Sequence, residues 1–105
     1  MTDIGVTMEW LMEDAVNPAT QNSLAKMTVA VGVTSERHHH TNCTETIHVL
    51  GGHIKQRIGE EWRDMTTGDT CLIPMNTSHQ TRNIGASPAV MMIAYSAGTR
   101  VYVKD

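Results

Sequence analysis

The sequence predicts an all-β fold, arranged as a sandwich or barrel in a single domain. Short runs of apolar or β-branched residues recur about every eight to twelve residues, with Gly, Pro and Asn at the joints between them. The chain shows no convincing helical period, and 105 residues are enough to enclose one core without a second domain.

The first expected element is an edge strand over residues 5–12. Four apolar residues alternate with other residues there, as a half-buried strand requires: Val6, Met8, Trp10 and Met12. The Asn17–Pro18 pair and the polar run 20–23 then predict a loop. We therefore expect residues 1–25 to be an N-terminal edge strand and loop, and residues 26–103 to be the barrel core.

A second strand is expected over residues 26–33, leading directly into a histidine-rich loop. Its inward-facing side chains should be Met27, Val29, Val31 and Val33. Turns are expected around Gly51–Gly52, at Gly59 and over residues 66–69, and Pro74 should end a strand because it has no N–H to donate. The remaining strands are expected over residues 46–50, 54–58, 62–65, 71–73, 89–95 and 100–103.

Two histidine-bearing stretches, residues 32–52 and 68–83, carry the candidate site. His38 and His40 are two residues apart, so on an extended chain both imidazoles leave from one face and the residue between them faces away. Glu45 can join them only if residues 41–44 bend. His79 could bring a third imidazole to the same place, and three imidazoles with one carboxylate make a metal site. A solvated histidine-rich loop is the simpler alternative, which the second stretch makes less attractive.

The two stretches together resemble the cupin family. The first cupin motif is a glycine, five residues, His-x-His, three or four residues, Glu, six residues and a glycine; the matching residues are Gly32, His38, His40, Glu45 and Gly52. The second motif is a glycine, five residues, Pro-x-Gly, two residues, His, three residues and Asn; the matching residues are Gly68, Pro74, His79 and Asn83. Asn76 replaces the motif's second glycine, and asparagine tolerates the positive φ that such a turn requires.

This resemblance, over residues 32–83, implies a small single-domain metal-binding cupin of the cupin 2 type. Its fold would be a double-stranded β-helix, the jelly-roll barrel, spanning residues 1–105 and commonly forming a homodimer. One divalent metal ion per chain would be held by His38, His40, Glu45 and His79. Mixed nitrogen and oxygen ligation suits Fe, Mn, Ni, Co and Zn, so the pattern does not select among them.

Strand alternation suggests which other residues line the substrate pocket. Gln56 should share a face with Ile54 and Ile58, and Thr81 should share one with His79. The strand over residues 89–95 contributes Tyr95 or Met92, and the pattern leaves open which of them points inward.

The other chemically capable residues receive simpler roles. Glu45 is the only interior carboxylate expected, so it would act both as ligand and as catalytic base unless a metal-bound hydroxide takes the proton. His48 and His53 are expected on the surface or at a dimer face, and Cys43 in a packed or solvated loop rather than as a reactive thiol or extra ligand. Seven methionines should fill a barrel without Phe, some of them lining the cavity: Met8, Met12, Met27, Met65, Met75, Met91 and Met92.

A metal with open coordination positions suggests a small oxygen-rich substrate, such as an enediol, a hydroxy-ketone or a catechol. The leading hypothesis is a dioxygenase-like oxidoreductase. The second is a metal-dependent isomerase, decarboxylase or lyase that acts on a sugar acid or keto acid. The third is a non-catalytic module that binds a small ligand, for which open coordination would serve no purpose.

Charge and hydropathy exclude other classes of partner. The net charge is −3 with eight Lys and Arg residues and no basic cluster, which argues against nucleic acid. The longest apolar run, over residues 89–95, is far shorter than the ~20 residues of a membrane-spanning helix. We expect a cytoplasmic protein, because the chain shows no secretion signal and its two cysteines are best interpreted as reduced thiols.

Overall fold

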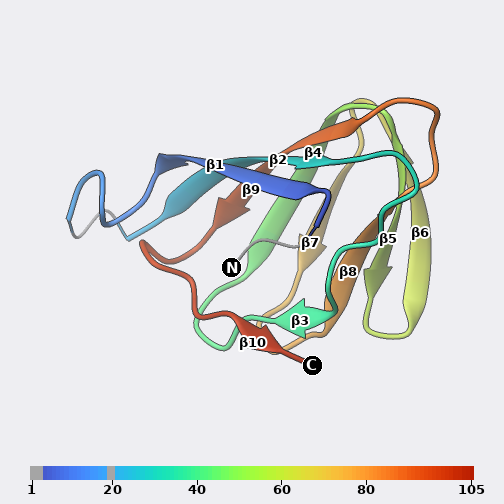
Figure 1. Ribbon diagram of the computed structural model, residues 1–105. Coiled ribbons are helices and arrows are strands. Elements are labelled where there is room, and N and C mark those ends of the chain that lie inside the picture. Colours follow the sequence, from blue (N-terminus) through green and yellow to red (C-terminus); the bar gives the residue numbers. More distant parts are fainter. Residues whose placement is uncertain (1–3, 19–20) are drawn as a thin grey trace.

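The computed structural model of the protein describes residues 4–18 and 21–105, which form two five-stranded antiparallel sheets facing each other (Figure 1). The expected all-β fold is confirmed, and no helix occurs among these residues. The strands are β1 (Val6–Met12), β2 (Ser23–Val29), β3 (His38–His39), β4 (Glu45–Gly51), β5 (His53–Ile58), β6 (Glu61–Thr66), β7 (Thr70–Ile73), β8 (His79–Asn83), β9 (Ala89–Tyr95) and β10 (Val103–Lys104).

Each sheet is assembled from strands that are distant in the sequence. The first sheet has the order β1-β2-β9-β4-β7 and the second has the order β10-β3-β8-β5-β6. The exchange of strands between the two sheets brings the histidine-bearing stretches together, because His38 of β3 stands directly opposite His79 of β8 in the register. Topology thus positions two candidate ligands that lie far apart in the chain.

Alternation builds the core between the two sheets. In β2, β4 and β9 every second residue is buried, so that each strand contributes one apolar face to the interior. Edge strand β1 shows weaker alternation, as predicted for a half-buried strand. The buried apolar residues of the cluster are Val6, Met27, Val29, Cys43, Ile47, Val49, Ile54, Met65, Cys71, Ile73, Ala89, Met91, Ile93 and Tyr95.

Strand β2 begins at Ser23, three residues before the expected start and inside the region predicted to be loop, and β3 and β8 were not among the predicted strands. Two further differences lie where strands were expected to extend. Strand β2 ends at Val29, and Val31, which was expected inside, is 53% exposed in the turn at Gly32, where φ is +76°. The closing strand β10 contains only Val103–Lys104, so residues 100–102 are irregular. Alternation identifies a strand but does not show where it stops, which explains both differences.

The methionines fill the barrel only in part. Met27, Met65 and Met91 are buried, whereas Met75 is 45% exposed, contrary to expectation. Met75 directly follows Pro74, where the chain leaves strand β7 for the turn before His79. Both cysteines, Cys43 and Cys71, are buried and free, consistent with reduced thiols.

Two turns require special backbone conformations. Gly52 has φ of +100°, and a Cβ atom there would lie 2.9 Å from the Cα atom of Ala89, so only glycine fits between β4 and β5. Asn76 has φ of +63°, which confirms that asparagine maintains the turn in place of the usual glycine. The backbone N–H of Asn76 donates a hydrogen bond of 2.8 Å to the carbonyl of His40. This turn therefore links the two histidine-bearing stretches.

Replacing Asn76 should reveal the cost of its left-handed conformation. Asn76→Val is expected to lower the free energy of unfolding by about 1–2 kcal/mol, because a β-branched residue disfavours positive φ at this exposed position. Asn76→Gly should be as stable as the parent or slightly more stable. Urea denaturation of the three proteins checks this, and equal midpoints for Asn76→Val and the parent would contradict it.

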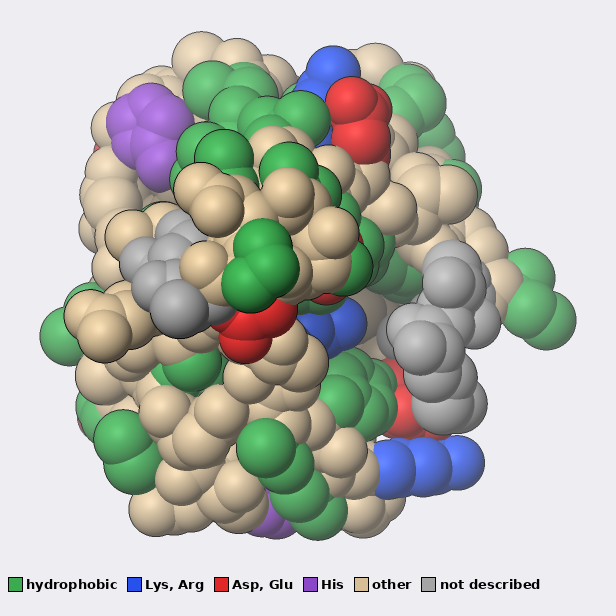
Figure 2. Space-filling model, turned by 90° about the vertical axis from the view of Figure 1, so that its left-hand side faces the viewer, with side chains coloured by type: hydrophobic (Ala, Val, Ile, Leu, Met, Phe, Trp, Pro, Cys, Tyr) green, Lys and Arg blue, Asp and Glu red, His purple; other side chains and the backbone are tan. Residues whose placement is uncertain are grey.

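The surface is hollowed on the side where the loop between β1 and β2 projects. Figure 2 shows this hollow with basic side-chain atoms visible inside it and acidic atoms near its opening. Within the described residues, no helix has both the length and the apolar character needed to cross a membrane.

Candidate metal centre

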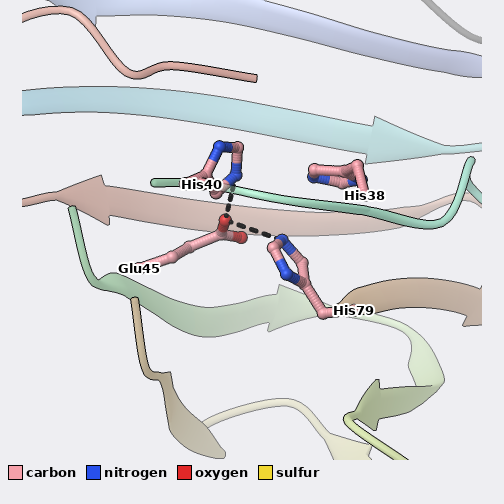
Figure 3. A group of neighbouring side chains, drawn as sticks. All are labelled: His38, His40, Glu45 and His79. Carbon is pink, nitrogen blue, oxygen red and sulfur yellow. Dashed lines mark hydrogen bonds and ion pairs between the residues drawn. The ribbon is translucent and has the colours of Figure 1, made fainter. Parts of the chain in front are cut away.

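The four residues expected to form the site converge at one point (Figure 3). His38 and His40 leave the same segment, Glu45 starts strand β4 and His79 starts strand β8. One ligand atom from each residue lies within 4.8 Å of all the others. His40, Glu45 and His79 are buried, and His38 is partly exposed. Residues 41–44 bend between the second and third of these residues, as predicted.

A single carboxylate oxygen joins two of the histidines. Oε1 of Glu45 lies 3.0 Å from Nε2 of His40 and 3.1 Å from Nε2 of His79 (Figure 3). Two ligand atoms that are each about 2.1 Å from one ion and at right angles to each other are separated by about 3.0 Å. The spacing would allow both imidazoles and the carboxylate to hold the same metal ion.

Backbone carbonyls determine which nitrogen of each imidazole faces this centre. Nδ1 of His38 donates to the carbonyl of Glu36 at 2.7 Å, Nδ1 of His40 to that of Val101 at 2.8 Å, and Nδ1 of His79 to that of Thr77 at 2.9 Å. A carbonyl only accepts, so the proton of each neutral ring is on Nδ1 and the lone pair is on Nε2. The Nε2 lone pairs and the carboxylate oxygen repel one another at these distances unless a positive charge lies between them. The donor set therefore fits a metal cation, with the outer hydrogen bonds that ligating histidines ordinarily make.

Electrostatics inside the cluster are strongly coupled. Burial alone would raise the pKa of Glu45, but without a metal ion the rings of His40 and His79, when protonated, donate hydrogen bonds to its carboxylate and lower that pKa well below its usual value. Burial alone would lower the pKa of His79, but the hydrogen bond with Glu45 and its negative charge raise it. His38 has no carboxylate contact, and burial lowers its pKa to about 4. Glu45 is therefore ionised and His38 is neutral at pH 7.

A cavity opens beside the cluster, with about 470 Å³ of space when the part open to solvent is included. Thr81, which was predicted to share a face with His79, and Tyr95 line it together with Met8 and Met27. Gln56 lies behind this wall: it is fully buried, and its Oε1 atom accepts a 2.6 Å hydrogen bond from the hydroxyl of Thr81.

Strand β9 settles the choice between Tyr95 and Met92. Tyr95 is buried and lines the cavity, whereas Met92 is partly exposed and does not line it. The two residues are three apart on a strand, so they occupy opposite faces. Burial raises the pKa of Tyr95 well above its usual value, and the charge of Glu45 adds to this effect, so its hydroxyl remains protonated.

Four cavity residues were missed by sequence reasoning: Val6, Ser35, Arg100 and Tyr102. The ring of Tyr102 stacks on His38 with centroids 4.3 Å apart and 16° between the planes. The guanidinium carbon of Arg100 lies over three aromatic rings, at 5.0–5.3 Å from their centroids. Both residues belong to the irregular segment after β9, where no periodic pattern could have assigned them a face.

The other histidines and Cys43 lie outside the cluster. His39 points away from it, and its Nδ1 atom lies 2.7 Å from Oδ1 of Asp105. His48 contacts Thr70 and His53 contacts Asp64 at the surface, as their strand positions predicted. Cys43 is 1% exposed and packs in the core.

Asn83 has a structural role. Its side-chain amide donates to the carbonyls of Val29 and Ser87, and its Oδ1 atom accepts from the N–H of Gly85. It therefore holds the loop between β8 and β9 against β2. The loop that it supports follows β8.

The comparisons with known proteins agree with this architecture. Residues 25–95, well over half of the chain, match the sequence model of the cupin domain. The chain belongs to the cupin family. A curated relative is 30% identical over 88 residues, covering 84% of this cupin and 70% of the relative: the uncharacterized protein MJ1618 of Methanocaldococcus jannaschii.

Solved structures of other cupins share the jelly-roll fold. Oxalate oxidase matches with a TM-score of 0.88 and 24% identity, over 98% of this chain and 56% of that one. A variant of Bacillus subtilis oxalate decarboxylase matches with a TM-score of 0.88 and 19% identity, over 99% of this chain and 29% of that one. KdgF from a Halomonas species matches with a TM-score of 0.80 and 14% identity, over 95% and 86%. At these identities the likeness shows the fold alone, and this chain spans only about half the length of oxalate oxidase.

Proposed function

We propose that this cupin is a metal-dependent enzyme with dioxygenase-like chemistry that acts on a small oxygen-rich molecule. One observation carries the proposal: three imidazole Nε2 atoms and a buried carboxylate converge beside a cavity that is open to solvent. A purely structural metal site is closed by its protein ligands, whereas a catalytic site retains access for substrate. The position of the cluster at the cavity wall supports catalysis over a structural role.

The residues of the site would have two roles, metal binding and proton transfer. His38, His40, Glu45 and His79 would hold one divalent ion, which supplies a Lewis acid and, if it is iron, chemistry with dioxygen. Glu45 is the only carboxylate among the described residues that line the cavity, so it is also our candidate proton acceptor. Its lowered pKa makes it a weak base and favours its role as a ligand.

The cavity walls suit a small substrate. Val6, Met8 and Met27 form an apolar side that limits the access of water, while Ser35 and Thr81 bring polar groups. The Thr81 hydroxyl donates to Gln56, and that of Ser35 accepts from the N–H of Thr81, so both are held in position. These groups would orient the oxygen atoms of a substrate.

A redox-neutral isomerase, decarboxylase or lyase is the alternative function. The same donor set would serve it without dioxygen, and this cupin resembles in fold both an oxidase and a decarboxylase. Elemental analysis of the purified protein, followed by aerobic and anaerobic assays with the metal found, tests the proposal. Oxygen uptake that depends on iron and substrate is expected. Equal turnover without oxygen would refute the dioxygenase assignment, and absence of bound metal would refute metal dependence.

Metal binding should depend on pH. Despite its burial, the hydrogen bond with Glu45 and the charge of that residue raise the pKa of His79, so protons compete more strongly for His79 than for His38, which stays neutral until about pH 4. A protonated imidazole cannot bind metal, so we expect the ion to be lost as the pH falls through about 6. Dialysis at a series of pH values followed by elemental analysis measures this, and one retained equivalent at pH 4 would contradict it.

We also propose a cytoplasmic homodimer. Two buried, unpaired cysteines suit a reducing compartment. Leu50 and Leu72 are exposed on neighbouring strands β4 and β7, where a second copy could cover them. Light scattering in solution is expected to give twice the mass of one chain, and a monomer at micromolar concentration would contradict this assembly.

A further inference from the structure

Arg100 occupies a special position at the mouth of the site. It lines both the cavity beside the metal cluster and a second hollow whose other lining residues are Trp10, Glu13, Gly98, Thr99 and Tyr102. Figure 2 shows basic side-chain atoms within a hollow on the side where the loop between β1 and β2 projects. A molecule that enters the cavity from the second hollow passes the guanidinium group.

Three aromatic rings hold this guanidinium in place. Its central carbon lies 5.2 Å from the ring centroid of Trp10, 5.3 Å from that of Tyr95 and 5.0 Å from that of Tyr102. Rings at such distances attract the cation through their π faces. The rings orient the planar guanidinium, but they do not accept hydrogen bonds from the five N–H donors on its edge. Carboxylates and carbonyls would accept such bonds.

The donors of Arg100 have no anionic partner among the described residues. No ion pair within 4.0 Å joins it to Glu13, which lines the second hollow, or to Glu45, which lines the cavity. The other arginines near carboxylates behave differently, since Arg37 and Arg57 both pair with Glu60. A partly buried guanidinium with unused donors is suited to binding an anion.

The backbone around Arg100 is tied to the ligand-bearing loop. Asn42 donates to the carbonyl of Thr99 at 2.9 Å and accepts from the N–H of Val101 at 2.8 Å, so it clamps both sides of Arg100. Asp14 binds the same segment through the hydroxyl of Thr99 and the carbonyl of Gly98. The position of the guanidinium relative to His40 and Glu45 is thereby restricted before any ligand arrives, which favours affinity.

We propose that Arg100 binds a carboxylate of the substrate, so that the ligand class is a small carboxylic acid with a hydroxyl, keto or second carboxylate oxygen for the metal. The inference rests on the proposed function, because the neighbouring oxygen needs the ion held by His38, His40, Glu45 and His79. The divalent ion and its carboxylate ligand would leave a net charge of +1, and Arg100 adds another at the wall of the same cavity. Such a field favours an anion over a neutral molecule of the same shape.

The test compares an acid with its amide, glycolate with glycolamide, which have nearly the same size and the same hydroxyl oxygen for the metal but differ in charge. Binding is followed by the visible absorption of the Co(II)-loaded protein, after its metal content has been measured. The parent is expected to bind glycolate at least tenfold more tightly than glycolamide. Arg100→Gln should weaken glycolate binding about ten- to a hundredfold and glycolamide binding less than threefold.

Two further variants distinguish the effect of the planar guanidinium of Arg100 from the effect of positive charge alone. Arg100→Lys retains the charge but loses the planar pair of donors, so glycolate binding should fall between that of the parent and that of Arg100→Gln. Arg82→Gln removes an exposed charge from the outer face of β8 and should change neither affinity by more than threefold. Unaltered glycolamide binding and metal content in Arg100→Gln show that its site is intact.

The outcomes distinguish the two proposals. A protein that binds Co(II) but prefers glycolamide or neither compound overturns the role of Arg100 while leaving the metal site in place. The same conclusion follows if Arg100→Gln retains the preference of the parent for glycolate. Failure to bind Co(II) with the four ligands intact refutes the proposed function itself, before any organic compound is added.

Discussion

Glu45→Gln is expected to reduce the affinity of the protein for its metal by more than about a hundredfold. The substitution preserves the shape of the side chain but removes the only charge that balances the ion, from a residue that is 4% exposed. Removing a residue that only hydrogen-bonds to a metal ligand typically lowers metal affinity about 10- to 100-fold. Removing a charged ligand itself should lower it further. Competition with a coloured chelator at pH 7.5 measures the change.

Glu9→Gln is the matched control for this experiment. Glu9 is exposed on strand β1, so the variant loses the same formal charge without touching the cluster. We expect its metal affinity to equal that of the parent. If Glu45→Gln also binds metal like the parent, Glu45 is not a ligand and the ion, if any, is held by the histidines alone.

Removal of the metal should cause the second large effect, a fall in thermal stability. A ligand that binds only the folded state stabilises it by about 4 kcal/mol when present at 1,000 times its dissociation constant. For a domain of this size each kcal/mol shifts Tm by roughly 4–8 °C, so treatment with a chelator should lower Tm by about 15 °C or more. The stabilisation arises because the ion joins β3, β4 and β8, which come from both sheets. Differential scanning calorimetry with and without the chelator measures the shift.

Glu45→Gln serves again as the internal comparison, since a protein that does not bind metal should have the same Tm before and after chelation. The parent should regain its original Tm when one equivalent of metal is restored. An unchanged Tm in the parent, with metal shown to be removed, would mean that the ion contributes nothing to folding.

His38, His40 and Glu45 could be predicted to lie together because the sequence intervals between them are short and fixed. His38 and His40 share a face for the simple reason that side chains alternate on an extended chain, and Glu45 needed only the bend that residues 41–44 provide. The second motif predicted His79 and even the unusual turn at Asn76. Residue types and short intervals explain the geometry within residues 38–45, whereas His79 is brought to the cluster by the pairing of β3 with β8.

The rest of the cavity was less predictable for physical reasons. Strand β9 is apolar on both faces, so composition could not show that Tyr95 points inward and Met92 outward. Arg100 and Tyr102 follow in a segment without regular structure, and their positions depend on contacts with distant residues such as Asn42 and Trp10. Such contacts are products of topology, and no short pattern encodes them.

The part of the chain that matches the cupin family ends at residue 95, yet the carbonyl of Val101, the ring of Tyr102 and the guanidinium of Arg100 all reach the site from beyond it. Under the proposed roles, the four residues that would hold the metal lie within residues 38–79, whereas Arg100, which would select the substrate, lies after residue 95. Variation in the last ten residues could change which molecule is accepted without disturbing the ion. A group of relatives defined only by the two cupin motifs would then contain proteins with different substrates. Comparing residues 96–105 as well would separate these proteins by substrate.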